Sequence, residues 1–275
     1  MLTQELDVIF TALFLLSGLI IGSLLNVFIY RIPLMHADPD NKKRLNLFWP
    51  RSQCRNCFET VRWQHNIPII SYLFLKGKCS YCKSSISIQY PIIESITAIL
   101  SIHCWMYFGL NIELLGALLF LWLLITISFI DINHKFIPDS LSFSLIFIGL
   151  SFSIIGKYYE LTGNFPNISS SILGILFGYL ILWSIYQIHK LLTKKEGLGY
   201  GDFKLLAGLG AWHGWQFIPI TIFIASIAGL IFGLLVIYKR KLDKDTPIPF
   251  GPFLATAGWI SFFYGSSIAS IYPIY

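Results

Sequence analysis

The sequence predicts an all-α polytopic membrane protein with about eight transmembrane helices and a small cytosolic cysteine-rich domain inserted after the first. Three observations predict this fold. First, 55% of the 275 residues are hydrophobic and only 12% are charged, whereas soluble domains carry about 25% charged residues. Second, the charges are clustered, and long uncharged runs separate the clusters. Third, four of the five cysteines fall in one loop as two Cys-x-x-Cys pairs.

Several uncharged runs are long enough, or nearly so, to cross a bilayer, which takes about 20 apolar residues in a helix. The runs are Val8–Tyr30, Ser95–Ile112, Leu114–Ile130, Ser140–Gly156, Leu161–His189, Leu205–Tyr238 and Thr246–Tyr275. The first lacks the basic flank and the small-residue cleavage site of a signal peptide, so we expect a retained span.

The basic residues orient these spans. Loops 31–94, 131–139, 190–204 and 239–245 hold 19 of the 20 Lys and Arg residues, all except Lys157. Because Lys and Arg accumulate on the cytoplasmic side, these loops are predicted inside and the N-terminus outside. The basic loops that account for the net charge of +6 then lie beside anionic lipid, and no nucleic-acid partner is expected.

The run 205–238 has inside loops on both flanks, so it must cross the membrane twice or not at all. Its 34 residues reach only about 51 Å as a helix. We therefore predict a short sixth helix near 204–215, a turn at His213-Gly214-Trp215 and a seventh helix ending at Tyr238. The predicted domains are a first transmembrane helix (1–30), a cytosolic tetracysteine domain (31–91) and a membrane core (92–275).

The cysteine pairs Cys54-Arg-Asn-Cys57 and Cys79-Ser-Tyr-Cys82 have 21 residues between them. Two such pairs at about this spacing are typical of a tetrahedral zinc site. Two disulfides are the alternative, which a reducing cytosol disfavours. Four thiolates leave no open position for a reacting water, so the zinc is expected to be structural. His36 and His65 offer substitute ligands that the spacing does not require, and Cys104 is expected to be a buried, inert thiol.

Few carboxylates lie in or beside the spans, where ionisable groups are functional candidates by default. They are Glu94, Glu113, Asp131, Asp139 and Asp202. Glu113 is expected to be a solvated charge in an outside turn. Asp139 precedes a long apolar run and is expected to be a helix N-cap. Asp131 directly follows an apolar run and has no cap to form, so it is predicted at the cytosolic membrane face.

Asp202 gives Asp131 a partner. It lies in Gly197-Leu-Gly199-Tyr-Gly201-Asp202-Phe-Lys204, at the cytosolic start of the predicted sixth helix, where glycines allow another helix or a substrate strand to approach closely. Two carboxylates that share one proton are the machinery of aspartic proteases. The ionised Asp takes a proton from water, while its protonated partner donates to the scissile carbonyl. The sequence contains no Gly-x-Ser-x-Gly elbow.

Further motifs accompany the two aspartates in a fixed order. They are Gly22-Ser-Leu-Leu-Asn26-Val-Phe-Ile-Tyr30-Arg31-Ile-Pro33, Asn66-Ile-Pro68, Lys76-Gly77-Lys78-Cys79, Tyr90-Pro91-Ile-Ile-Glu94, Ile137-Pro138-Asp139 and Phe250-Gly251-Pro252. As an ordered set covering most of the chain, they resemble the bacterial type IV prepilin leader peptidases, membrane aspartic proteases with a Gly-x-Gly-Asp signature. Two mild departures from the family pattern, Leu24 and Gln89, do not touch the aspartates.

The resemblance implies that Asp131 and Asp202 are the catalytic pair and that the four knuckle cysteines bind zinc. It implies prepilin and type II secretion pseudopilin substrates, cut at the cytosolic face of the bacterial inner membrane. It also implies N-methylation of the new N-terminus with S-adenosylmethionine. No Gly-x-Gly-x-x-Gly loop is found for this donor. Glu94, Gly22 and Asn26 are best placed to contribute to its site, although each could instead pack helices.

A membrane transporter that uses Asp131 and Asp202 as ion-coupling carboxylates is the main alternative. The predicted position of both aspartates at one membrane face, rather than at mid-depth, disfavours it. A zinc-assembled membrane scaffold without chemistry is the second alternative, and it would not require Asp202 in a glycine-rich setting.

Overall fold

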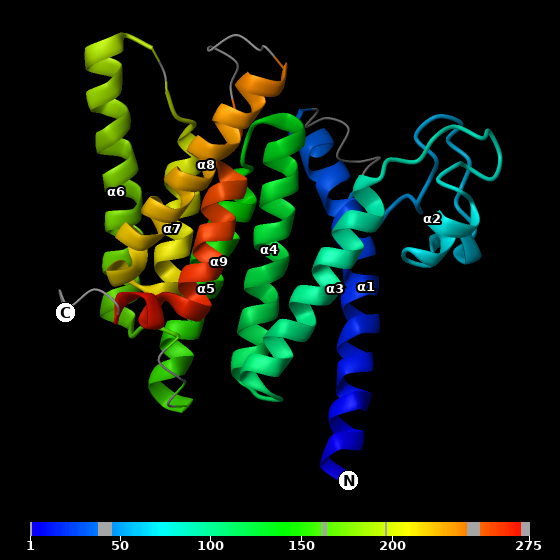
Figure 1. Cartoon of the computed structure of the whole chain (residues 1–275), viewed down its shortest axis with the longest axis horizontal. Helices are drawn as coiled ribbons and strands as arrows, with labels where there is room; N and C mark the ends of the chain where they lie inside the picture. Colours follow the sequence, from blue (N-terminus) through cyan, green and yellow to red (C-terminus); the bar gives the residue numbers. More distant parts are fainter. Residues whose placement is uncertain are drawn as a thin grey trace. The chain divides into compact units, whose positions relative to one another are not determined.

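The computed structural model describes residues 2–37, 46–159, 161, 164–195, 197–240 and 248–270. Long helices make up most of this part of the chain (Figure 1). They are α1 (Leu2–Ala37), α3 (Gln89–Phe108), α4 (Ile112–His134), α5 (Asp139–Tyr159), α6 (Ile168–Thr193), α7 (Tyr200–His213), α8 (Ile218–Arg240) and α9 (Gly251–Ala269). The short elements are α2 (Ile70–Phe74), η2 (Trp63–Asn66) and η3 (Trp215–Phe217). Within the described ranges, β pairing is confined to two isolated bridges.

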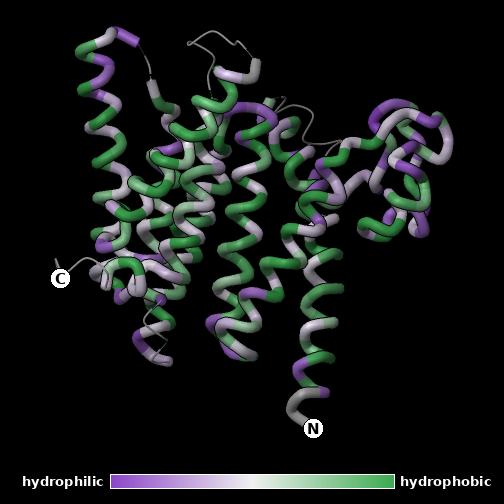
Figure 2. The backbone as a smooth tube through the Cα atoms, in the orientation of Figure 1, coloured by the Kyte–Doolittle hydropathy of each residue, from purple (hydrophilic) through white to green (hydrophobic). Residues whose placement is uncertain are grey.

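Six helices in the described residues are long and apolar enough to cross a membrane. They are Glu5–Ala37, Gln89–Phe108, Ile112–His134, Asp139–Tyr159, Ile168–Thr193 and Trp215–Tyr238, and hydrophobic residues dominate along them (Figure 2). The predicted all-α membrane fold is confirmed. The count of eight spans stays a prediction, because the 14 residues of α7 reach about 21 Å and the hydrocarbon core is about 30 Å thick. The predicted loop 239–245 and both ends of the run 246–275 lie partly outside the described residues.

The first compact unit comprises Met1–Thr126 and is built on α1 and α3, which lie side by side (Figure 1). Gly22 brings these helices close, since a Cβ there would fall 2.6 Å from the Cα of Glu94. Four residues later, Asn26 Nδ2 donates to the backbone oxygen of Tyr90 at 3.2 Å. Close approach through small residues and interhelical hydrogen bonds is how membrane helices associate. These contacts fix the start of α3 against α1.

The second compact unit, Ile127–Tyr275, is organised around α7, which packs against α5, α6 and α9 (Figure 1). Every α7 residue from Asp202 to His213 is buried except Lys204. Gly178 of α6 allows a close approach, because a Cβ there would fall 2.6 Å from the backbone oxygen of Leu206, and Gly174 meets Gly210 of α7 still more closely. The short helix is therefore enclosed by protein over nearly its whole length.

The predicted turn after the sixth helix is confirmed. α7 ends at His213, Gly214 follows with a φ of +80°, and η3 begins at Trp215. The predicted start near residue 204 is wrong by about one turn, because the structure begins α7 at Tyr200. Asp202 consequently lies inside the first helical turn.

Glu113 is buried rather than solvated. It lies in the first turn of α4 and is only 4% exposed. Its Oε2 accepts a hydrogen bond from Asn111 Nδ2 at 3.3 Å. A carboxylate at a helix N-terminus is stabilised by the unpaired N–H groups and the macrodipole there, which helps to offset the loss of water. The expected burial of Cys104 is confirmed, because its side chain is fully buried in α3.

Candidate active site

Two buried carboxylates lie at helix ends in the second unit. Asp131 is in the last turn of α4, and Asp202 is in the first turn of α7; they are 5% and 7% exposed. Asp131 Oδ2 accepts a hydrogen bond from the backbone N–H of Gly251 at 2.9 Å. Asp202 Oδ2 accepts one from the N–H of Gly199 at 3.2 Å. Each carboxylate is therefore oriented by a backbone donor, which has less freedom than a side chain.

Asp131 and Asp202 belong to neighbouring segments, which meet at Ile137. Ile137 packs against the segments of both. A Cβ on Gly201 would fall 2.8 Å from Ile137 Cβ, and a Cβ on Gly251 would fall 3.2 Å from Ile137 Cδ1. A Cβ on Gly251 would also fall 2.7 Å from Asp131 Oδ2. The close approach of the three segments thus depends on glycine at both positions.

Asp139 has a different partner from the one expected of an N-cap. α5 begins at Asp139 itself, and Asp139 Oδ1 accepts a hydrogen bond from Lys204 Nζ of α7 at 2.6 Å. The carboxylate of Asp139 is therefore bound by the side chain of Lys204, from a segment remote in sequence, and not by the start of its own helix. The ion pair joins α5 to α7 two residues after Asp202.

Two residues near the aspartates were not singled out from the sequence, Gly251 and Lys204. Both stand in motifs quoted above, Phe250-Gly251-Pro252 and Gly199–Lys204. Their partners are remote in sequence, and a backbone N–H donor carries no signature of residue type. The glycine before Pro252 was the only signal that could have found the first of them.

The four knuckle cysteines form a compact cluster in the first unit, with all four Sγ atoms within 4.8 Å of one another. The two pairs have the same local structure. Cys54 N donates to Glu59 O at 2.9 Å, and Cys79 N donates to Ser84 O at 2.9 Å. Each knuckle contains a residue with a φ of +59°, and these are Phe58 and Lys83. The repeated turn points both cysteine pairs at one place.

The cluster fits a tetrahedral metal ion. Zinc–sulfur bonds of about 2.3 Å in a tetrahedron require sulfur atoms about 3.8 Å apart. Cys54 Sγ and Cys82 Sγ are 3.8 Å apart. A hydrogen bond with Ser84 Oγ, 3.0 Å from Cys82 Sγ, lowers the pKa of Cys82 to about 6 and favours its thiolate. Burial and hydrogen bonds with the other three thiols raise the pKa of Cys57. In the described residues neither His36 nor His65 joins this cluster.

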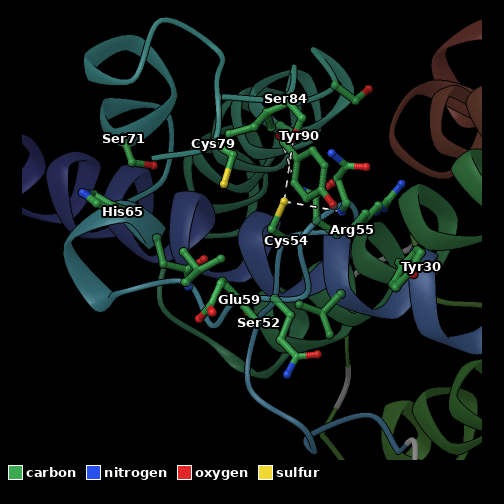
Figure 3. A pocket seen from close by; sticks show the side chains of 18 of the residues that line it. Tyr30, Ser52, Cys54, Arg55, Glu59, His65, Ser71, Cys79, Ser84 and Tyr90 are labelled. Atoms are coloured by element: carbon green, nitrogen blue, oxygen red, sulfur yellow. Dashed lines mark hydrogen bonds between the residues drawn. The ribbon is translucent and has the colours of Figure 1, made fainter. Parts of the chain in front are cut away.

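A cavity of about 710 Å³ lies in the first unit beside the cysteine cluster (Figure 3). Its lining comes from α1, the cysteine loop and the start of α3. Two of the three residues proposed for a donor site, Asn26 and Glu94, line this cavity. Gly22 instead lies at the contact between α1 and α3.

Comparison with known proteins gives matches over nearly the whole chain. A model described as the bacterial peptidase A24 N-terminal domain matches residues 16–108. A model of the type IV leader peptidase family matches residues 118–234. No solved structure matches.

Curated relatives carry the name prepilin leader peptidase/N-methyltransferase. The protein of Stutzerimonas stutzeri is 43% identical over 272 residues, which cover 94% of this chain and 92% of the relative. That of Aeromonas salmonicida strain A449 is 42% identical over 287 residues, 98% of this chain and 96% of the relative. That of Pseudomonas aeruginosa strain PAO1 is 42% identical over 272 residues, 94% and 91% of the two chains. These relatives give no support to the transporter alternative.

Proposed function

Because the chain belongs to the type IV leader peptidase family, we propose that it removes the leader of prepilins and of type II secretion pseudopilins and N-methylates the exposed N-terminal residue. The observation that carries the peptidase proposal is the pairing of two buried, backbone-oriented carboxylates, Asp131 and Asp202. The matching names of the relatives support the methylation.

The proposed cleavage uses one proton shared between Asp131 and Asp202. Two buried carboxylates that share one site favour a singly protonated pair. The ionised carboxylate takes a proton from water, and the water oxygen attacks the scissile carbonyl carbon. The protonated carboxyl donates its hydrogen bond to the carbonyl oxygen. As the tetrahedral species collapses, the C–N bond breaks and the leaving amine receives the proton that water gave up.

The proposed orientation places the reaction at the cytosolic face of the inner membrane. Asp131 and Asp202 both lie beside loops predicted inside from their Lys and Arg content. A prepilin leader that remains in the cytosol, joined to an apolar segment in the bilayer, would present its cleavage point at this depth.

The proposed metal is zinc, held by Cys54, Cys57, Cys79 and Cys82. Its contribution would be to fold the cysteine loop, because four protein ligands leave no open coordination position. The proposed methyl donor is S-adenosylmethionine, which supplies an electrophilic methyl group to the amine released by cleavage.

The peptidase proposal is tested with single isosteric variants. Asp131→Asn and Asp202→Asn should each abolish cleavage of a co-expressed reporter prepilin. Each variant leaves one carboxyl group beside an amide, and these two groups cannot share a proton and activate water. Membrane insertion and protein level should stay unchanged. Asp139→Asn is the matched control, since its carboxylate lies in the same unit but pairs with Lys204, and it should retain cleavage. Normal processing by either aspartate variant would refute the proposed mechanism.

A further inference from the structure

The short helix α2 carries an apolar patch that the described part of the chain leaves uncovered. Leu73 and Phe74 are 67% and 84% exposed, and Ile70, one turn earlier, is also exposed. Residues three and four apart share one face of a helix, so these three side chains form a single patch. Tyr72 and Leu75, on the other side of the helix, line the cavity. The helix therefore turns one side toward the protein and an apolar side outward.

The patch lies beside a membrane-spanning helix. The backbone N–H of Ile69, directly before α2, donates to Glu94 Oε2 at 2.7 Å. Glu94 lies five residues inside α3, which is about 7.5 Å along the helix axis, and α3 is one of the candidate spans. In Figure 1, α2 lies on the side of the cysteine loop that is nearer to the N-terminal end of α1. The start of α2 is therefore held level with the first turns of α3, where this span meets the membrane surface.

A basic hollow adjoins the patch. It has a volume of about 250 Å³, and Lys76, Lys78 and Lys83 line it together with Phe74. Its described lining contains no Asp or Glu. Apolar side chains beside lysines are typical of segments that lie at the surface of an anionic bilayer. A further exposed aromatic residue, Trp63, belongs to η2, which contacts α2, and Trp is enriched at membrane–water interfaces.

We propose that α2 docks the cysteine loop on the bilayer surface. Ile70, Leu73 and Phe74 would insert among lipid acyl chains, and the three lysines of the hollow would bind the phosphates of anionic lipids. Each lysine near an anionic surface contributes about fivefold to such binding. Candidate spans flank the loop on both sides, so the patch is already confined close to the membrane and docking is effectively intramolecular. The inference needs membrane insertion of α1 and α3 and does not depend on the proposed peptidase and methyltransferase activities.

The test uses a photoreactive side chain in the full, zinc-loaded chain. p-Benzoyl-phenylalanine replaces Phe74 in one preparation and Phe58 in another, and each is reconstituted in nanodiscs of phosphatidylglycerol and phosphatidylcholine. Phe58 is the matched control, because it is 72% exposed in the same loop but lines the cavity. After illumination, mass spectrometry of the labelled peptide measures lipid adducts. We expect at least about fivefold more lipid adducts at position 74 than at position 58.

Paired lysine variants test the charge of the hollow. In the parent chain, phosphatidylglycerol should be enriched among the adducts at position 74 by at least about threefold over its share of the lipid mixture. Lys76→Gln combined with Lys78→Gln should abolish this enrichment. Lys194→Gln combined with Lys195→Gln removes the same charge from another loop predicted inside and should leave the enrichment unchanged. Zinc content should be equal in both variants, because the lysines are proposed to bind lipid and not to balance the cysteine thiolates.

Several outcomes would overturn the proposal. Equal lipid adducts at positions 58 and 74 would refute docking on the bilayer. Adducts with a prepilin placed in the same nanodisc, in place of lipid, would make the patch a protein-binding surface. Adducts that match the bulk lipid mixture in the parent chain, or zinc loss in the variant of Lys76 and Lys78, would refute the role of the lysines. Position 73, on the same exposed face, gives a second probe with the same expected result if the first variant does not retain zinc.

Discussion

At the scale of single residues, backbone N–H groups orient the two proposed catalytic carboxylates. Gly251 and Gly199 each direct an N–H at one carboxylate oxygen. Such donors are fixed by the helix start to which they belong, so they need no reorganisation when charge moves between the carboxylates. The positions of the Asp131 and Asp202 carboxylates are therefore fixed by the helices that carry these donors.

Gly251→Ala should damage catalysis without removing any functional group. A Cβ at this position would fall 2.7 Å from Asp131 Oδ2, so the carboxylate or α9 must shift. Displacements of about 1 Å at a reacting group can cost about a hundredfold in rate. We expect kcat for prepilin cleavage to fall by at least about tenfold, with KM little changed. The measurement is steady-state cleavage of a purified prepilin.

Gly233→Ala in α8 is the control for that substitution. The nearest atom to its Cβ would be Ile248 Cδ1 at 3.4 Å, an ordinary contact with a flexible side chain. This variant should cleave at the wild-type rate. If both alanine variants cleaved at the wild-type rate, the close approach of Gly251 to Asp131 would have no part in orienting that carboxylate.

At the scale of elements, α7 explains both the success and the limits of prediction from sequence. The uncharged runs predict most long helices, because a membrane admits few alternatives to an apolar helix. Parity of the basic loops also predicts the turn at Gly214. The early start of α7 at Tyr200 was missed, since glycines at 199 and 201 indicate a loop until tertiary packing encloses them. The burial of Glu113 and the ion pair of Asp139 with Lys204 were missed because both depend on tertiary contacts.

The cysteine loop carries the element-scale prediction. Cys57→Ser should lower zinc stoichiometry, measured by mass spectrometry of the purified protein, and should lower its steady-state level. The reason is that the loop has two isolated bridges and little core, so metal binding would supply much of its folding free energy. Cys104→Ser removes a thiol outside the cluster and should leave the zinc content unchanged. Full zinc occupancy in Cys57→Ser would contradict a four-thiolate site.

At the scale of the whole molecule, the chain divides its proposed chemistries between two compact units. The cysteine cluster and the cavity beside it belong to Met1–Thr126, while both aspartates belong to Ile127–Tyr275. The family models divide the chain in nearly the same way, at residues 16–108 and 118–234. Sequence motifs predicted the cysteines of the cluster and the two aspartates. No motif predicted the cavity, because three separate segments line it.

Membrane orientation is the whole-molecule prediction. With 19 of 20 basic residues in loops predicted inside, a cysteine introduced by Glu5→Cys near the N-terminus should react with a membrane-impermeant maleimide in spheroplasts. Cys82, exposed in the cysteine loop, should react only after the membrane is opened and the metal is chelated. Labelling in the reverse pattern would invert the proposed topology and place the aspartates on the opposite side.

The hydrogen bond from Gly251 to Asp131 has a consequence for biosynthesis. A ribosome delivers both aspartates to the membrane well before it delivers the residue that braces the first of them. A growing chain would thus contain both aspartates before the hydrogen bond from Gly251 to Asp131 can form. Peptidase activity would therefore begin only when α9 docks, and incompletely synthesised chains would not cleave the prepilins in the same bilayer.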